Sequence, residues 1–82
     1  MHEMGVADSI LHAVDKELLR YPGRRALKVN IRVGRYAGVE HDSLQFCFES
    51  MVKGTTWEPL ELEIEQSAGD ELDFTALELD DL

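Results

Sequence analysis

The N-terminal residues Met1, His2 and Glu3 bring together nitrogen donors of the kinds that bind transition metals. A chain terminus supplies an amine, successive backbone amide nitrogens and here the imidazole of His2, all within a few bonds. Such an all-nitrogen set with deprotonated amides suits the square-planar geometry of nickel and copper. The alternative on spacing alone is a disordered terminus with an idle histidine.

The other candidate chemical groups are two further histidines and a single cysteine. His12 falls on the polar side of an expected helix, and His41 falls in the first turn of another. His41 is either a plain solvated residue or an auxiliary metal ligand, whereas an enzyme using His12 or His41 as a base would lack a nucleophile and a catalytic partner. We expect Cys47 to be a buried, inert thiol, and a lone cysteine excludes an internal disulfide and a four-cysteine zinc site.

Charge is divided unevenly along the 82 residues, whose net charge is −9. Residues 1–53 carry all eight Lys and Arg with seven acids, whereas residues 54–82 carry ten acids and no Lys or Arg. This balance disfavours nucleic acid and anionic membranes as partners. The acids form either a solvated sheet face with a solubilising tail or a patch for a basic partner. No apolar run is long enough for a membrane span or a signal peptide, so we expect a cytoplasmic protein.

Hydrophobic periodicity predicts two helices and three strands. Apolar residues recur at helical spacing over residues 4–20, where Met4 begins the stripe, and over residues 40–53. Strict alternation predicts strands over residues 27–34 and 60–65. A third strand over residues 72–79 changes its apolar phase at Ala76-Leu77, which indicates a bulge.

These elements predict an α+β fold: a two-layer domain with a three-stranded, mixed sheet and both helices on its apolar face. The first two strands, joined through a helix, favour a parallel pair, and the five-residue turn 66–70 favours a hairpin of the last two strands. The order of the strands does not follow from these patterns. The aromatic and methionine residues expected in the core or at its rim are Phe46, Phe48, Phe74, Met51 and Trp57.

The order of several motifs resembles the HypA/HybF family of hydrogenase-maturation nickel metallochaperones. The chain opens with Met1-His2-Glu3-Met4 followed by an amphipathic helix, as that family does. The matching segments after it are Val29–Gly34, Ala37–Glu40, Leu44–Glu49, Lys53–Thr56, Leu60–Ile64 and Leu72–Leu79. The resemblance therefore covers nearly the whole chain.

The resemblance implies a metal-transfer function without catalysis. It implies that His2 is the principal Ni(II) ligand, with the Met1 amine and the amides of His2 and Glu3 beside it. It also implies two partners, a HypB-type GTPase and the large-subunit precursor of nickel–iron hydrogenase, or urease in some bacteria. The alternative is an adaptor of the same family that docks maturation partners without transferring metal.

The chain departs from the family where a zinc domain with two CxxC pairs is expected. The interval between the second and third strands is only the turn 66–70, which has no cysteine. We therefore expect residues 1–82 to form a single HypA-like nickel-binding domain, with the zinc domain absent and no structural zinc.

Overall fold

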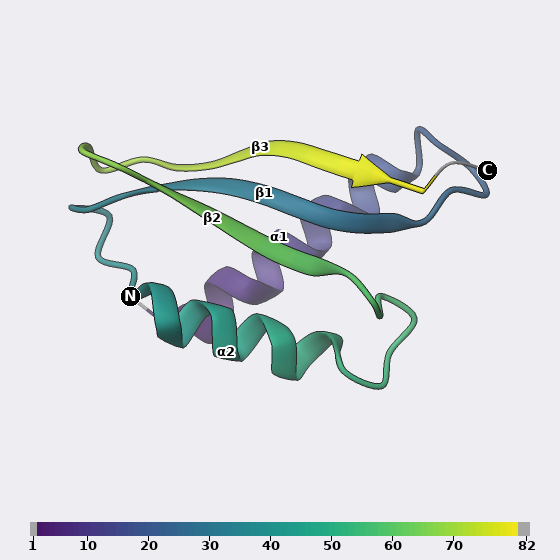
Figure 1. Ribbon diagram of the computed structural model, residues 1–82, viewed down its shortest axis with the longest axis horizontal. Helices are drawn as coiled ribbons and strands as arrows, with labels where there is room; N and C mark the ends of the chain where they lie inside the picture. The colour runs from purple at the N-terminus through teal and green to yellow at the C-terminus, as the bar shows by residue number, and fades with distance from the viewer. Residues whose placement is uncertain (1, 81–82) are drawn as a thin grey trace.

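The computed structural model describes residues 2–80 and contains two helices and a three-stranded sheet (Figure 1). In chain order the elements are α1 (Glu3–Leu18), β1 (Ala26–Gly34), α2 (His41–Val52), β2 (Glu61–Ser67) and β3 (Leu72–Leu79). The α+β fold is confirmed, although α1 ends two residues earlier than its periodicity predicts. Neither helix in this part of the chain is long and apolar enough to cross a membrane.

The sheet is mixed, with strand order β2-β1-β3. β1 pairs in parallel with β2 and antiparallel with β3, so the predicted parallel pair is confirmed. Register places Leu62 and Phe74 on the same face as Val29 and Ile31, and both helices lie on this inner face (Figure 1). The expected bulge is also confirmed, because the register of β3 shifts between Phe74 and Ala76.

The predicted hairpin of β2 and β3 is wrong, since these strands occupy opposite edges of the sheet. The turn between them passes over the end of β1: Arg35 N–H donates to the Ser67 carbonyl at 3.0 Å, and Tyr36 N–H donates to the Gly69 carbonyl at 2.9 Å. The turn packs so closely that a Cβ on Gly34 would overlap the Gly69 carbonyl. The short connection thus joins β2 to β3 without pairing them, because the backbone groups of the connection form hydrogen bonds with the end of β1.

The core lies between the helices and the first two strands. α1 contributes Val6, Ile10 and Leu11, among others, and the largest fully buried side chain is Phe48 of α2. Three apolar residues expected inside are exposed: Met4 at 54%, Phe46 at 71% and Phe74 at 38%. Phe46 lies about 200° around α2 from Phe48 at 100° per residue, so both cannot face the sheet.

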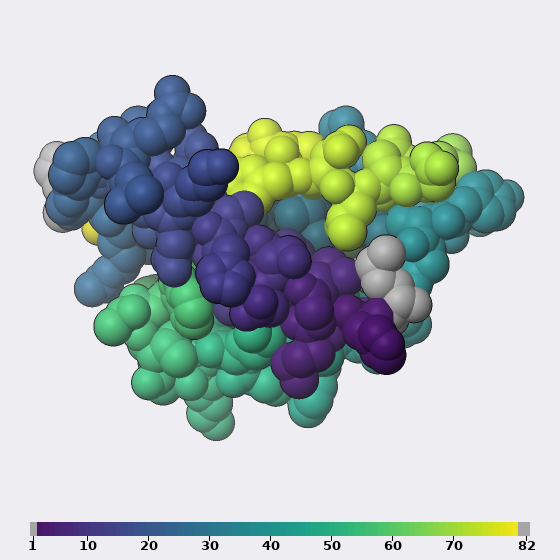
Figure 2. All heavy atoms as spheres, turned by 180° about the vertical axis from the view of Figure 1, so that it is seen from behind, coloured from purple at the N-terminus to yellow at the C-terminus, as the bar shows by residue number. Residues whose placement is uncertain are grey.

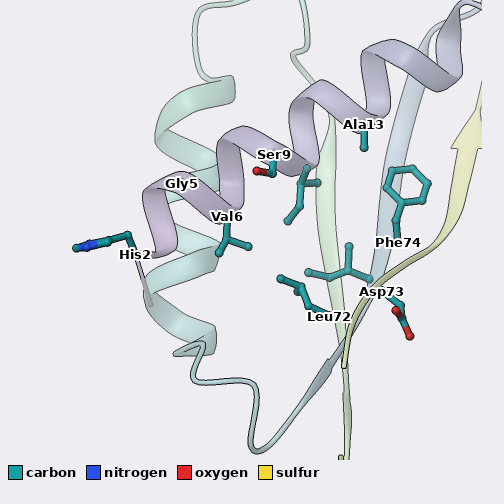
Figure 3. A pocket seen from close by; sticks show the side chains of 10 residues that line it. His2, Gly5, Val6, Ser9, Ala13, Leu72, Asp73 and Phe74 are labelled. Atoms are coloured by element: carbon teal, nitrogen blue, oxygen red, sulfur yellow. The ribbon is translucent and has the colours of Figure 1, made fainter. Parts of the chain in front are cut away.

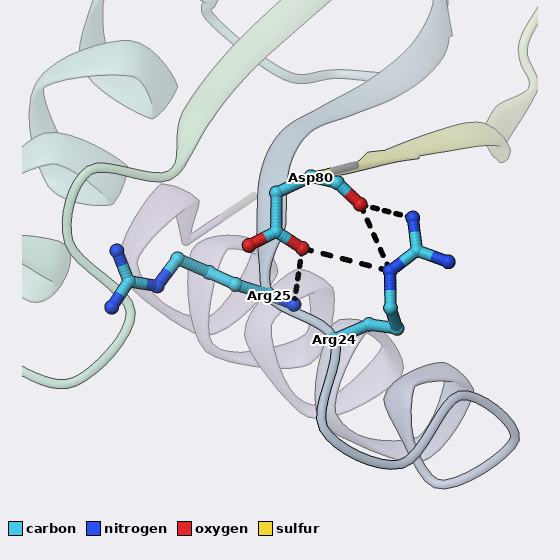
Figure 4. A network of polar contacts seen from close by, with 3 residues as sticks. All are labelled: Arg24, Arg25 and Asp80. Carbon is cyan, nitrogen blue, oxygen red and sulfur yellow. Dashed lines mark hydrogen bonds and ion pairs between the residues drawn. The ribbon is translucent and has the colours of Figure 1, made fainter. Parts of the chain in front are cut away.

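The end of β3 is tied to the turn that precedes β1 (Figure 4). Arg24 donates through Nε to the Asp80 carbonyl at 2.9 Å, and Arg25 N–H donates to Asp80 Oδ1 at 2.9 Å. The guanidinium of Arg24 also makes a second hydrogen bond to the same carbonyl. These contacts anchor the C-terminal end of β3, next to a second register shift between Ala26 and Lys28.

Candidate metal centre

His2 lies at the N-cap of α1 in an extended conformation, with φ −84° and ψ 105°. Its carbonyl accepts the first helical hydrogen bond from Val6 N–H at 3.1 Å, whereas its side chain makes no capping hydrogen bond. The imidazole points outward from the start of the helix (Figure 3). Helix geometry leaves the amides of His2 and Glu3 without acceptors in the helix, so imidazole and amide nitrogens are available together.

Met1, the third residue expected at this site, lies outside the described residues. The structure therefore positions two of the three expected site residues, His2 and Glu3.

Glu3 turns its carboxylate toward the start of α2. Its Oε2 accepts a hydrogen bond from Glu40 N–H at 3.0 Å, although the two residues are 37 positions apart. This backbone donor is the main reason why the pKa of the Glu3 carboxyl lies below its ordinary value. The side chain of Glu3 is thus engaged with α2, which leaves its amide as the group beside His2.

Glu40 caps α2, a role that charge alone did not reveal. Its carboxylate accepts from Ser43 N–H at 2.7 Å and from Asp42 N–H at 3.2 Å. These two donors hold the pKa of the Glu40 carboxyl below its ordinary value. The sequence signal was present, because an acid directly before an apolar helical stripe is a candidate cap as well as a partner for the helix dipole.

His41 follows Glu40 directly and is the first residue of α2. The hydrogen bond from Glu40 N–H to Glu3 places this turn of α2 beside the start of α1. His41 is half-buried. Both the solvated role and the auxiliary role therefore remain compatible with its position.

The remaining candidates lie elsewhere. His12 is exposed and its Nδ1 is 3.3 Å from Asp8 Oδ2. It is ten residues from His2, or about 15 Å along a helix, so the two imidazoles cannot hold the same ion. Cys47 is half-buried and packs against the core rather than being fully enclosed as expected.

Within residues 2–80, no three His, Cys, Asp or Glu side chains converge in a way that could hold a metal ion. A site built here around His2 therefore differs from a cage of side chains. It would combine one imidazole with backbone nitrogens, the donor set that favours square-planar Ni(II) or Cu(II).

Comparison with known proteins identifies one family. The sequence model described as "Hydrogenase/urease nickel incorporation, metallochaperone, hypA" matches residues 1–71, which include every element except β3. The chain is 44% identical over 68 residues to the hydrogenase maturation factor HypA of Chlorobium limicola, a match that covers 83% of this chain and 59% of the relative. The corresponding protein of Chlorobaculum tepidum is 42% identical over 69 residues, covering 84% of this chain and 61% of the relative. The chain thus spans about 60% of the length of the curated relatives it matches.

Proposed function

This chain belongs to the HypA family, and on that basis we propose that it binds Ni(II) at its N-terminus and passes the ion on during hydrogenase maturation. The proposed ligands are the imidazole and amide of His2, the amine of Met1 and the amide of Glu3. Nickel is the cargo of this protein, which acts as a binding and transfer module rather than as a catalyst.

The observation that supports this proposal best is the geometry of the first turn of α1. The His2 side chain makes no capping bond, and the Glu3 side chain is held by Glu40 N–H at 3.0 Å. Anchoring Glu3 to α2 fixes the backbone on one side of His2. The amide nitrogens are then held beside an imidazole that faces solvent.

A site at the start of a helix also suits transfer. Its ligands can be replaced one at a time by those of an acceptor, because no enclosing side chains have to open. We propose that the acceptor is the hydrogenase large-subunit precursor and that a HypB-type GTPase assists, both in the cytoplasm. We further propose that the domain formed by these residues binds no structural zinc.

Nickel calorimetry on untagged protein tests this proposal, because a tag at the N-terminus would remove the amine ligand. We expect His2→Ala to weaken nickel binding by well over tenfold, since it leaves only amine and amide nitrogens. Folding should scarcely change, because the first buried residue of α1 is Val6. Only a deprotonated imidazole nitrogen binds metal, so nickel binding should also weaken as the pH falls from neutral toward about 5.

His12→Ala is the matched control, since it removes an exposed imidazole from the same helix. It should bind nickel as the parent does. If His2→Ala bound nickel as tightly as the parent, the metallochaperone proposal would fail. The alternative, an adaptor that docks maturation partners without transferring metal, would then take its place.

A further inference from the structure

The helices cover the inner face of β1 and β2 but leave that of β3 partly open. On the inner face Ile31 is 1% exposed and Leu62 is 6% exposed, whereas Leu72 is 39% and Phe74 38% exposed. Figure 2 shows β3, in yellow, running beside α1, in purple, along an outward-facing seam. The apolar side of β3 therefore lacks the cover that the other two strands have.

A groove of about 430 Å³ follows this seam. Val6 of α1 lies on one side of the groove and Leu72 and Phe74 lie on the other (Figure 3), and Ile10 and Ile31 are also among the lining residues. The other lining residues of α1 are small and recur every four positions: Gly5, Ser9 and Ala13. Their side chains project little from this face of the helix, which leaves room for the groove. The groove can therefore receive apolar side chains from outside.

The strand beside the groove has a free edge. β3 pairs with β1 on one side, and no other strand of residues 2–80 pairs with its second side. An unpaired edge presents N–H and C=O groups that can accept a further strand. An added strand would direct every second side chain to the inner face, where the groove lies.

The outer face of the sheet indicates the charge of such a strand. Lys28 and Arg32 of β1 are engaged mainly by β2, with Lys28 Nζ 3.2 Å from Glu63 Oε2 and Arg32 Nε 2.6 Å from Glu65 Oε1. On β3, Glu78 is 4.0 Å from Lys28 Nζ, and within the described part of the chain Asp73 makes no ion pair. A strand added beside β3 would thus meet Asp73 and Glu78, acids whose neighbouring cations Lys28 and Arg32 lie closer to the acids of β2.

We propose that the free edge of β3 docks an extended polypeptide segment in which apolar residues alternate with Lys or Arg. Its apolar side chains enter the groove, and its cations face Asp73 and Glu78. β1 is an example of such a segment within the protein. Its residues alternate in this way, and the strand pairs with the other edge of β3.

A second copy of the chain is a poorer occupant. Its net charge of −9 opposes self-association, and its two edge strands alternate apolar residues with acids instead of bases. The free edge of β2 is a poorer dock for the segment, since Leu62 on its inner face is already covered.

The groove begins at His2, which is among its lining residues. A segment docked there would end beside the proposed nickel ligand and could carry a ligand of its own to the ion. This role in transfer rests on the proposed function, whereas docking itself rests only on the groove, the free edge and the charges.

The test is fluorescence anisotropy with a labelled peptide of the sequence of Ala26–Gly34, titrated with the full chain in excess chelator. We expect saturable binding, and at least about fivefold weaker binding to Ala13→Gln, which fills the groove from the helix side, and to Asp73→Asn. Ser50→Gln, an exposed change on α2, is the matched control and should bind as the parent does. Peptides with Glu in place of Lys and Arg, or with Ser in place of the apolar residues, should not bind.

Several results would overturn the proposal: no saturable binding, equal binding of either control peptide, or equal affinities for Ala13→Gln and Ser50→Gln. Dimerisation of the peptide-free chain that Ala13→Gln abolishes, measured by sedimentation, would assign the groove to a second copy instead. The peptide titration contains no nickel, so it tests docking separately from metal binding. If His2→Ala lost nickel binding but still bound the peptide, the docking proposal would be supported. The reverse pattern, nickel bound but no peptide bound, overturns docking alone.

Discussion

The carboxylates of Glu3 and Glu40 connect the beginnings of the two helices. Glu40 caps its own helix, and its N–H in turn holds the side chain of Glu3. In both cases a carboxylate accepts from backbone N–H groups, which favours the charged form and lowers the pKa. Folding and the ionisation of these two groups are therefore linked.

Glu40→Gln should make stability less dependent on pH in acid. Because folding lowers the pKa of Glu40, its contribution is complete above its ordinary value of 4.5 and is lost as the pH falls through the lower folded-state pKa. The variant has no carboxyl at this position, so its free energy of unfolding should fall less steeply below that pH. Urea denaturation at a series of pH values measures the slopes, with Glu61→Gln on β2 as the control. Equal slopes for the parent and Glu40→Gln would contradict the linkage.

His41→Ala should leave nickel affinity within about twofold of the parent. In the proposed site, the Met1 amine, the two amides and the imidazole of His2 would supply the four nitrogens of a square plane, so His41 could add only an axial ligand. Calorimetry on the untagged variant provides the measurement. A tenfold loss, about 1.4 kcal/mol, would instead establish His41 as a ligand.

At the scale of elements, α2 shows how one helix divides its aromatic residues. Phe48 is fully buried between the helix and the sheet, whereas Phe46 is 71% exposed on the opposite side. Both residues belong to the same short apolar run. Because each residue of a helix is turned by about 100° from the one before it, the two side chains point to opposite sides of α2. Stability should therefore depend on one of them and scarcely on the other.

Phe48→Ala should lower the free energy of unfolding by about 3–5 kcal/mol, because it removes buried surface and leaves a cavity. Phe46→Ala is the matched control and should stay within about 0.5 kcal/mol of the parent. Denaturant unfolding of the two variants compares the same chemical change at two positions of one helix. Similar losses in both would mean that α2 is rotated relative to this structure.

At the scale of the whole molecule, the packed core is made of apolar side chains contributed by α1, β1, α2 and β2 with Leu60 beside them. The buried side chains of this core are all apolar, so we expect it to form without a bound metal ion. The turn over the end of β1 closes the sheet through backbone hydrogen bonds. We therefore expect burial and strand pairing within these residues to be enough for the two-layer arrangement.

Circular dichroism should consequently be unchanged when the protein is placed in excess chelator. Helix and sheet signals, and the midpoint of thermal unfolding, should match those of untreated protein. A loss of structure on chelation would show that a bound metal ion contributes to folding. Rebinding of individual metals would then identify which ion is responsible.

The amino-acid sequence alone predicts which segments form helices and strands, because periods of 3.6 and 2 follow from local backbone geometry. It also indicated the parallel first pair, the bulge in β3 and His2 as the candidate ligand. The hydrogen bond between Glu3 and Glu40 was decided by the tertiary structure alone, since the two residues are 37 positions apart.

Tertiary structure likewise decided the strand order, in which the short connection between β2 and β3 crosses over the end of β1 instead of closing a hairpin. The same short connection would fit a hairpin of β2 and β3 or the observed order. In the observed order, β2 and β3 each pair with one edge of β1. Exposure of Phe46 and Phe74 was decided at this level too, because an apolar residue is buried only where another element covers it. The two helices cover the inner faces of β1 and β2, and they leave the apolar inner face of β3 partly exposed.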